Sequence, residues 1–167
     1  MKSDVSVRQV LPEDLPQISA LHARVFGPGR FVRTAYRVRE GAPAISPYCR
    51  KALLEERLVA AIRYTAVRIG GEAGALMLGP LAVELLLAGQ GFGRRLVAET
   101  LAAAEAGGIR LVVLVGDLPY YGRFGFNRIP PGQIRLPGPV DPDRILAAEL
   151  RPGALACYSG LLKADLD

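Results

Sequence analysis

The chain has 167 residues, half of them hydrophobic, and a formal net charge of +5 at pH 7. This length suits one domain that buries a core without disulfides or metal ions to staple it, so we expect a single domain over residues 1–167. No uncharged apolar run approaches the roughly 18 residues needed to span a bilayer, and the N-terminus lacks the apolar region of a signal peptide. We therefore expect a soluble cytoplasmic protein that does not act on membranes.

The positive charge comes almost entirely from arginine, because Lys2, Lys51 and Lys163 are the only lysines. Nine arginines fall between Arg24 and Arg68, which favours acidic ligands. Aromatic residues do not interleave with these arginines as a nucleic-acid groove would require. A solvated basic surface is therefore favoured over nucleic-acid binding.

Residue types that bind metals or act as nucleophiles are scarce. Cys49 and Cys157, the only cysteines, lie far apart in sequence, which favours two small reduced core residues over a disulfide or a metal site. His22, the only histidine, lies beside the apolar stripe of the first predicted helix, and the sequence spacing offers it no cysteine, serine or acid partner. We therefore expect no metal ion and leave His22 out of the site.

The first forty residues predict one strand and two helices. Val5 and Val7 indicate the strand, and residues 11–14, with a proline and two acids, are typical of a helix start. A second, shorter helix is predicted over residues 31–40. The polar residues in or beside it are Arg30, Arg33, Tyr36 and Arg37. They either contact a substrate or form ordinary surface.

From Cys49 onward the pattern predicts strands with turns at 55–57 and 70–71. One strand is expected over 58–69 and the next over 75–84, and the apolar run 81–87 indicates a buried strand. Pro80 cannot donate to a strand ladder, so it predicts a bulge or a local splaying of the strands. Backbone groups freed by such a splay become available to an extended ligand.

Residues 89–93, Gly-Gln-Gly-Phe-Gly, stand where strand periodicity gives way to helical periodicity. A helix start leaves N–H groups unpaired at the positive end of the helix dipole, and glycines let a phosphate approach them. This joint therefore predicts an anion cradle, to which Arg94 and Arg95 add charge. The alternative is a glycine-rich turn without a ligand. The spacing excludes a Walker A loop and the dinucleotide fingerprint, whose third glycine would fall at Arg94.

The helix after the joint is expected to bury one face, and Arg95 and Glu99 form an i,i+4 pair off that face. The residues of the buried face are Leu96, Val97, Thr100, Leu101 and Ala104. Residues 109–115, IRLVVLV, then predict a buried central strand.

The central strand is followed by residues 116–126, GDLPYYGRFGF, in which Asp117 can cap a short helix that Gly125 ends. The last two apolar segments, 145–150 and 155–162, are expected to form a closing hairpin through a Pro-Gly turn.

Taken together, the apolar strand, the glycine joint before a helix, the next buried strand and Tyr121-x-x-x-Gly125-Phe126 resemble the GNAT superfamily of acyl-CoA-dependent N-acetyltransferases. The order and spacing match, and GDLPYYGRFGF resembles a small bacterial branch of predicted acetyltransferases. The resemblance implies an α/β fold with a mixed, splayed central β-sheet flanked by helices. Acetyl-CoA would be wedged between the strands that end near Glu84 and Val115.

The resemblance also implies how acetyl-CoA is bound. The main chain of Leu81, Ala82 and Val83 would pair with the pantetheine arm. The residues whose amides would hold the diphosphate are Gln90, Gly91, Phe92, Gly93 and Arg94, with Arg95 adding charge. The family usually has glutamine or arginine three residues before the middle glycine, and this chain departs from that pattern at Ala88.

Tyr121 matches the family tyrosine that is usually assigned as the general acid for the departing CoA thiolate. A phenol with a pKa of about 10 stays protonated at neutral pH and can donate to the sulfur. The alternatives are that Tyr120 takes this role or that both tyrosines only pack the loop. Glu84 is the carboxylate nearest in sequence to the predicted thioester and is a candidate base, with backbone carbonyls and water as alternatives.

The function implied is transfer of the acetyl group of acetyl-CoA to a primary amine, directly within a ternary complex. The cysteines lack an activating neighbourhood in sequence, which agrees with a reaction that uses no enzyme nucleophile. A non-catalytic CoA-binding or regulatory module is the alternative class, and nucleic-acid binding ranks last. The sequence leaves open the identity of the amine acceptor and whether two chains form a homodimer.

Overall fold

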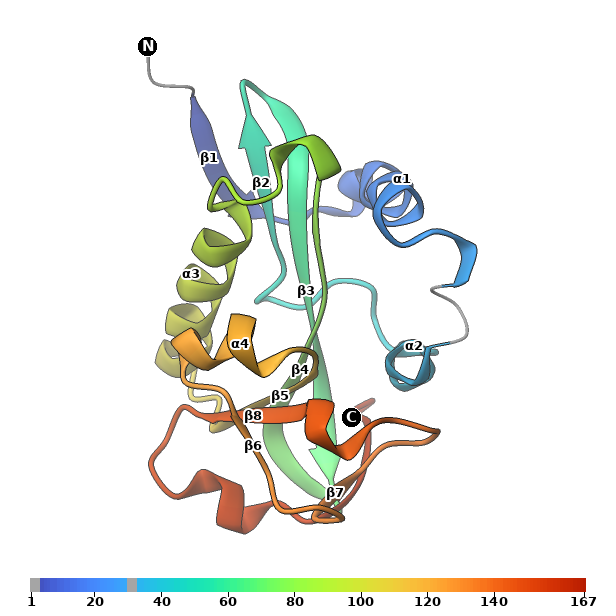
Figure 1. The fold of residues 1–167 in the computed structure, drawn as a ribbon, viewed down its shortest axis with the longest axis vertical. Coiled ribbons are helices and arrows are strands. Elements are labelled where there is room, and N and C mark those ends of the chain that lie inside the picture. The colour runs from blue at the N-terminus through green and yellow to red at the C-terminus, as the bar shows by residue number, and fades with distance from the viewer. Residues whose placement is uncertain (1–3, 30–32) are drawn as a thin grey trace.

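A central β-sheet with helices on both sides organises the chain in the computed structural model, which describes residues 4–29 and 33–167 (Figure 1). The strands are β1 Val5–Gln9, β2 Arg50–Leu54, β3 Arg57–Ile69, β4 Glu72–Val83, β5 Leu111–Val115, β6 Asn127–Arg128, β7 Ile134–Arg135, β8 Ile145–Glu149 and β9 Gly160–Ala164. The α-helices are α1 Leu15–Phe26, α2 Thr34–Arg39, α3 Phe92–Ala106 and α4 Leu118–Tyr121. The short 3₁₀ helices are η1 Pro12–Asp14, η3 Leu85–Leu87, η4 Gly122–Phe124, η5 Pro142–Arg144 and η6 Ala154–Cys157.

Within the described ranges, no helix combines the length and the apolar character needed to cross a bilayer.

The sheet is mixed, with the strand order β1-β2-β3-β4-β5-β8-β6. Strands β1 to β4 are antiparallel neighbours, whereas β4 and β5 are parallel and are connected through α3. Strand β9 returns to pair with β3 and with β7. The predicted α/β architecture, a mixed sheet flanked by helices, is confirmed.

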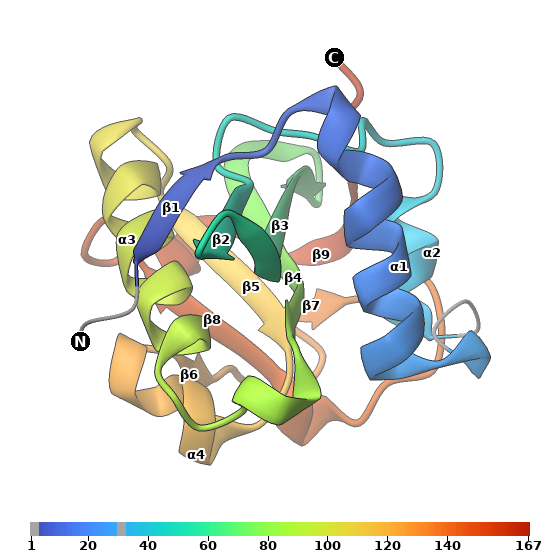
Figure 2. The ribbon, with the colours of Figure 1, turned by 90° about the horizontal axis from the view of Figure 1, so that it is seen from above.

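The helices lie on opposite faces of the sheet, with α3 on one side and α1 and α2 on the other (Figure 2). Successive residues of a strand point to opposite faces, so each strand serves both cores. On β3, Ile62 packs into the cluster under α3, whereas Ala61 packs into the cluster under α1. On β5, Val112 and Val113 divide in the same way between the α3 side and the cluster that contains Val38 of α2. This two-sided burial explains why the β5 sequence is apolar throughout.

Helix α3 agrees with its prediction. The five residues expected on its inner face, Leu96, Val97, Thr100, Leu101 and Ala104, are all buried. On the outer face, Arg95 Nε lies 3.3 Å from Glu99 Oε1. Helix α2 begins at Thr34, and the first residues of its predicted range, 31–32, lie outside the described residues.

The prediction of a buried strand over 81–87 is wrong beyond Val83, where β4 ends. Residues Leu85–Leu87 form η3, and the side chains of Leu85 and Leu86 are 64% and 94% exposed. The amide of Leu87 donates to the carbonyl of Glu84 at 2.9 Å, so local turn bonds replace the strand ladder. The turn is needed because the chain must cross from β4 to the start of α3, and leucine residues alone do not signal it.

The predicted closing hairpin is also wrong. Strand β8 pairs with β5 and β6, whereas β9 pairs with β3 and β7. A turn does form at Gly153, but it leads into η6, where the Leu155 amide donates to the Glu149 carboxylate at 2.9 Å. This helical turn redirects the chain away from β8. It also leaves Cys157 exposed, contrary to the prediction of a core residue, whereas Cys49 is buried as expected.

Candidate active site

The parallel pairing of β4 and β5 lasts for three residues on each strand and then stops. Ala75 to Met77 pair with Leu111 to Val113, and no pair follows Met77. Strand β4 continues against β3 alone, with one extra residue between Leu78 and Leu81 relative to β3. The predicted bulge at Pro80 and the predicted splay are both confirmed, and the two strands diverge from this point.

A cavity of about 590 Å³ occupies the space between the diverging strands. We call it the β4/β5 cleft. Its walls include residues 77–81 of β4, Leu114 and Val115 of β5, Tyr121 of α4, and parts of α2 and of the 139–144 segment. The cleft lies at the carboxyl end of a parallel strand pair, which is where open α/β sheets bind ligands. Its volume is within the usual range for a small-molecule site.

Tyr121 is one of the residues that line the cleft. Its ring packs edge-on against Phe126 at a centroid distance of 5.8 Å and against Tyr120 at 4.8 Å. A β-carbon on Gly116 would lie 2.8 Å from the Tyr121 ring, so a glycine is required there for the ring to adopt this position. Burial, with smaller contributions from Tyr120 and Asp117, raises the pKa of Tyr121 to about 12. The hydroxyl is therefore a proton donor throughout the neutral range.

Tyr120 points elsewhere, against the first turn of α3. Its hydroxyl lies 2.7 Å from the position that a β-carbon of Gly93 would occupy. Gly93 is buried, and the same position is 3.6 Å from side-chain atoms of Leu81 and Val83. The absence of a side chain at Gly93 is thus explained by packing under Tyr120, rather than by access for a ligand as the sequence suggested. Of the two tyrosines, only Tyr121 lines the cleft.

The two earlier glycines of the joint are open, as predicted. Gly89 and Gly91 have φ values of 80° and 92°, a region that side chains rarely adopt, and a β-carbon on either would meet nothing within 4 Å. Gly91 is the N-cap of α3, and no side chain caps this helix end. The first amides of a helix have no intrahelical partner. The amides of Gly91 to Arg94 are therefore available, whereas that of Gln90 donates to the Leu87 carbonyl at 3.3 Å.

The predicted pantetheine contacts lie on the section of β4 that has left β5. Leu81, Ala82 and Val83 pair with β3 on one side. On the other side, no described strand pairs with them. Ala82 is buried, and Leu81 and Val83 are half-buried. This unpaired edge can form backbone hydrogen bonds with an extended ligand.

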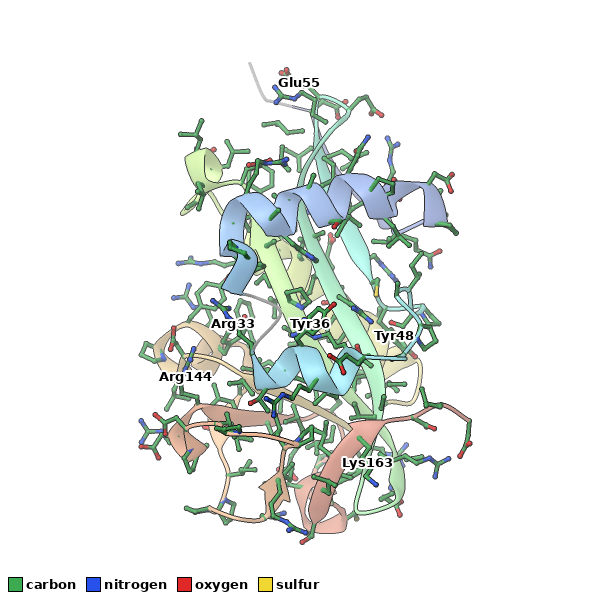
Figure 3. All side chains as sticks on the ribbon, turned by 90° about the vertical axis from the view of Figure 1, so that its right-hand side faces the viewer. Arg33, Tyr36, Tyr48, Glu55, Arg144 and Lys163 are labelled. Atoms are coloured by element: carbon green, nitrogen blue, oxygen red, sulfur yellow. The ribbon has the colours of Figure 1, made fainter. Side chains whose placement is uncertain are left out.

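A second cavity, of about 300 Å³, lies between α1, α2 and the sheet. We call it the arginine cavity because Arg33, Arg39 and Arg63 all line it. Figure 3 looks onto this face and shows Arg33 and Tyr36 in the space between α1 and α2. His22, which was not predicted to be part of the site, lines this cavity too. Its signal in the sequence is weak, because helical spacing places it beside the buried stripe without showing what it faces.

Glu84, the predicted base, follows directly after β4. Its Oε1 atom lies 2.5 Å from Nη2 of Arg24 on α1, and its side chain is 28% exposed. Glu84 lines neither the β4/β5 cleft nor the arginine cavity. Its role as base stays a prediction.

The polar residues in or beside the second predicted helix are Arg30, Arg33, Tyr36 and Arg37. The structure brings Arg33 and Tyr36 to the arginine cavity and Arg37 to the wall of the β4/β5 cleft, while Arg30 lies outside the described residues. Sequence reasoning missed Arg39 and Arg63, which come from α2 and β3.

In residues 4–29 and 33–167, no group of three or more histidine, cysteine or acidic side chains is arranged to hold a metal ion.

The splayed parallel pair beside an uncapped, glycine-led helix agrees with the family that the sequence resembles. A sequence model of the acetyltransferase (GNAT) domain matches residues 6–129. The chain belongs to the GNAT acetyltransferase family.

Relatives of known structure have this GNAT fold with CoA or acetyl-CoA bound. The uncharacterized N-acetyltransferase YhbS of Escherichia coli K12 is 28% identical over 162 residues, which cover 94% of each chain. The crystal structure of E. coli YhbS in complex with CoA is 27% identical, with a TM-score of 0.83 over 99% of this chain and 92% of that one. A GNAT acetyltransferase of Brucella melitensis in complex with acetyl-CoA is also 27% identical, with a TM-score of 0.65 over 86% of this chain and 95% of that one.

Proposed function

We propose that residues 1–167 form one catalytic domain that transfers the acetyl group of acetyl-CoA to a primary amine. The observation that carries this proposal is the β4/β5 cleft, which opens where strand pairing stops at Met77 and is lined by Tyr121. The CoA complex of YhbS and the acetyl-CoA complex of the Brucella protein support it, because both have this fold.

The start of α3 fits a diphosphate. The amides of Gly91, Phe92, Gly93 and Arg94 lie at the positive end of a 15-residue helix and have no side-chain cap. A phosphate can approach them because Gly89 and Gly91 have open space where side chains would stand. Arg94 and Arg95 are exposed beside the joint; Arg94 adds a full positive charge, and the charge of Arg95 is shared with Glu99. The free edge of Leu81–Val83 would receive the pantetheine arm.

The proposed reaction is a direct transfer within a ternary complex. The amine nitrogen attacks the carbonyl carbon of the thioester, a C–N bond forms, and the C–S bond breaks. The thiolate leaves and takes the proton of the Tyr121 hydroxyl, which regains a proton from solvent. The attacking nitrogen gives up its extra proton to a base. No enzyme nucleophile is needed, since the acetyl group passes from sulfur to nitrogen in one displacement at carbon.

Two side chains are candidates for the base. Glu84 is the carboxylate that the sequence indicated, but its oxygen is held by Arg24. His22 lines the arginine cavity and belongs to the residue type whose unperturbed pKa lies closest to neutrality. Water is the third candidate, and replacing each side chain in turn distinguishes the three.

A non-catalytic CoA-binding module is the competing function, favoured by Ala88 where the family usually has a polar side chain. Isothermal titration calorimetry with acetyl-CoA and thiol release over a panel of amines distinguish the two. We expect binding together with amine-dependent thiol release. Binding without release for any amine would support the module, and no binding would contradict both functions.

A further inference from the structure

The arginine cavity combines apolar walls with concentrated positive charge. Its apolar lining comes mainly from α1 and the sheet, and includes Leu15, Ile18, Phe26, Ala61 and Pro80. Its charge comes from Arg33, Arg39 and Arg63. No aspartate or glutamate is among the described residues that line it, and the undescribed residues 1–3 and 30–32 contain no acid. The cavity is therefore electropositive, with no carboxylate in its wall to balance the charge.

Within the described residues, these three guanidinium groups also have no carboxylate partner outside the cavity. None of the ion pairs in that part of the chain includes Arg33, Arg39 or Arg63. Arg63 donates to the Pro43 carbonyl at 3.2 Å, and the Arg33 guanidinium lies 5.5 Å from the centroid of the Phe26 ring. The Nε atoms of Arg39 and Arg63 are buried and, among the described residues, have no hydrogen-bond partner. Other arginines of the chain, such as Arg24 and Arg68, do have carboxylate partners.

Without a bound anion, this arrangement of arginines destabilises the folded protein. Burial, and then the charges of Arg63 and Arg33, lower the pKa of Arg39 to about 10. Burial likewise lowers the pKa of Arg63. Removing a charged group from water without a partner costs free energy, and like charges placed together add to that cost. An anion bound in the cavity would offset both costs, and the lack of a carboxylate among the described lining residues points to a ligand.

The position of the cluster connects it to the reaction. Phe26, Arg33, Arg39 and Pro80 line both the arginine cavity and the β4/β5 cleft. One Nη atom of Arg39 lies 3.5 Å from the position of a β-carbon on Gly79, at the bulge where β4 leaves β5. A molecule bound to these arginines therefore lies next to the cleft in which we propose that the thioester is attacked.

We propose that the acceptor is a small primary amine with an apolar body and an anionic oxygen group, which Arg39, Arg63 and Arg33 hold. The inference rests on the proposed acetyl transfer and adds the substrate class. A guanidinium matches a carboxylate or a phosphate equally well through two parallel N–H bonds, so the anion is one of these two. Polycationic amines are the acceptors that this cavity excludes.

Matched amines test the substrate class. Leucine, leucinamide and 3-methylbutylamine share one apolar body and one amine, but only leucine has the carboxylate. The phosphonate analogue of leucine supplies the phosphate-like arm, and spermidine supplies the polycation. A hydrogen bond to a charged group contributes about 1.5–3 kcal/mol, so we expect kcat/KM for the anionic amines to exceed that of the neutral ones by about 10- to 100-fold. The ratio of leucine to its phosphonate tells which anion is preferred, and spermidine should not be acetylated.

Variants assign the preference to the cavity. Arg39→Met and, separately, Arg63→Gln should abolish the preference for anionic amines, measured as a ratio of kcat/KM values within each variant. A general loss of structure would lower both members of the ratio equally and leave the preference in place. Arg39→Met should also raise the melting temperature, because it removes a buried unpaired charge. Arg128→Gln, at an exposed arginine that lines neither cavity, is the control.

Binding measurements keep this inference separate from the proposed function. Calorimetry with the protein alone measures binding of leucine and N-acetylleucine to the cavity, and a second titration measures acetyl-CoA. If acetyl-CoA does not bind, the proposed acetyl transfer is wrong whatever the cavity binds. If acetyl-CoA binds, the substrate class is wrong in two cases: neutral amines react as well as anionic ones, or no anionic amine either binds or reacts.

Discussion

The β4/β5 cleft and the arginine cavity are neighbours that share part of their lining, yet they are built differently. The cleft is made by the backbone, since the pairing of β4 with β5 stops and a bulge turns β4 away from β5. The arginine cavity is made by side chains of α1, α2 and β3 that meet across the sheet face. Backbone sites bind what many proteins share, such as a diphosphate, whereas side-chain sites select a particular substrate. In the functions proposed above, the common co-substrate binds along the cleft and the specific acceptor binds in the arginine cavity.

Gly91→Asp should give the largest effect, which is a loss of affinity for acetyl-CoA at the uncapped start of α3. Aspartate at a φ of 92° strains the cap, and its carboxylate repels a diphosphate at the amides of α3. Losing two charged hydrogen bonds amounts to about 4 kcal/mol, or about 1,000-fold in the dissociation constant of acetyl-CoA measured by calorimetry. Gly108→Asp is the matched control, because Gly108 also has a positive φ and open space but lies at the other end of α3. Equal losses in the two variants would remove the cradle from the proposal.

Tyr121→Phe should lower kcat by about 100-fold, the lower end of what a general acid contributes, and leave acetyl-CoA binding nearly unchanged. The loss follows from removing the proton donor in the cleft without changing the shape of the ring. Tyr120→Phe is the natural comparison, because its hydroxyl packs on Gly93 and does not line the cleft. Steady-state kinetics and acetyl-CoA titrations measure both variants. If Tyr120→Phe has the larger effect on kcat, Tyr120 rather than Tyr121 is the general acid.

The sequence predicted the cleft well because its determinants are local. The glycine joint, the bulge at Pro80 and the apolar β5 each follow from the conformational limits of a few adjacent residues. Tyr121 could be chosen only through the family resemblance, and only the structure shows that Tyr120 turns toward Gly93.

The arginine cavity could not be predicted because its parts are distant in sequence. His22, Arg39 and Arg63 belong to α1, α2 and β3, and nothing in their spacing shows that they face one space. The wrong hairpin has the same origin. A Pro-Gly turn specifies a reversal at Gly153, but it does not say that η6 will follow and carry β9 to the far side of β3.

Replacing each candidate base should show which region takes the proton of the amine. If His22 is the base, His22→Gln should lower kcat/KM by about tenfold or more near neutral pH. If Glu84 is the base, Glu84→Gln should do so instead. Arg24→Gln separates a catalytic from a structural role of Glu84, since it removes the ion pair and leaves the carboxylate. Full activity in both His22→Gln and Glu84→Gln would assign the proton to water.

The smallest effect concerns the free energy of unfolding at high pH. Tyr121 in the β4/β5 cleft and Arg39 in the arginine cavity should change it in opposite directions as pH rises. The pKa of Tyr121 is raised to about 12. Between pH 10 and 12 the unfolded chain therefore releases a phenol proton that the folded protein keeps. Stability falls by up to about 1.4 kcal/mol per pH unit in this range. The pKa of Arg39 is lowered to about 10, so above that pH the folded protein releases a proton that the unfolded chain keeps, and stability rises.

Urea unfolding at several pH values between 9 and 12 tests both signs by difference. Relative to the wild type, Tyr121→Phe should gain stability as pH rises. The extra stability that Arg39→Met has over the wild type should become smaller over the same range. The many other groups that titrate in this range are common to all three proteins and cancel in these differences. Parallel curves of unfolding free energy against pH for wild type and Tyr121→Phe would mean that the phenol is not buried in the folded protein. Parallel curves for wild type and Arg39→Met would mean that the Arg39 guanidinium carries no uncompensated charge. The second result would remove the electrostatic reason for assigning an anionic acceptor to the arginine cavity.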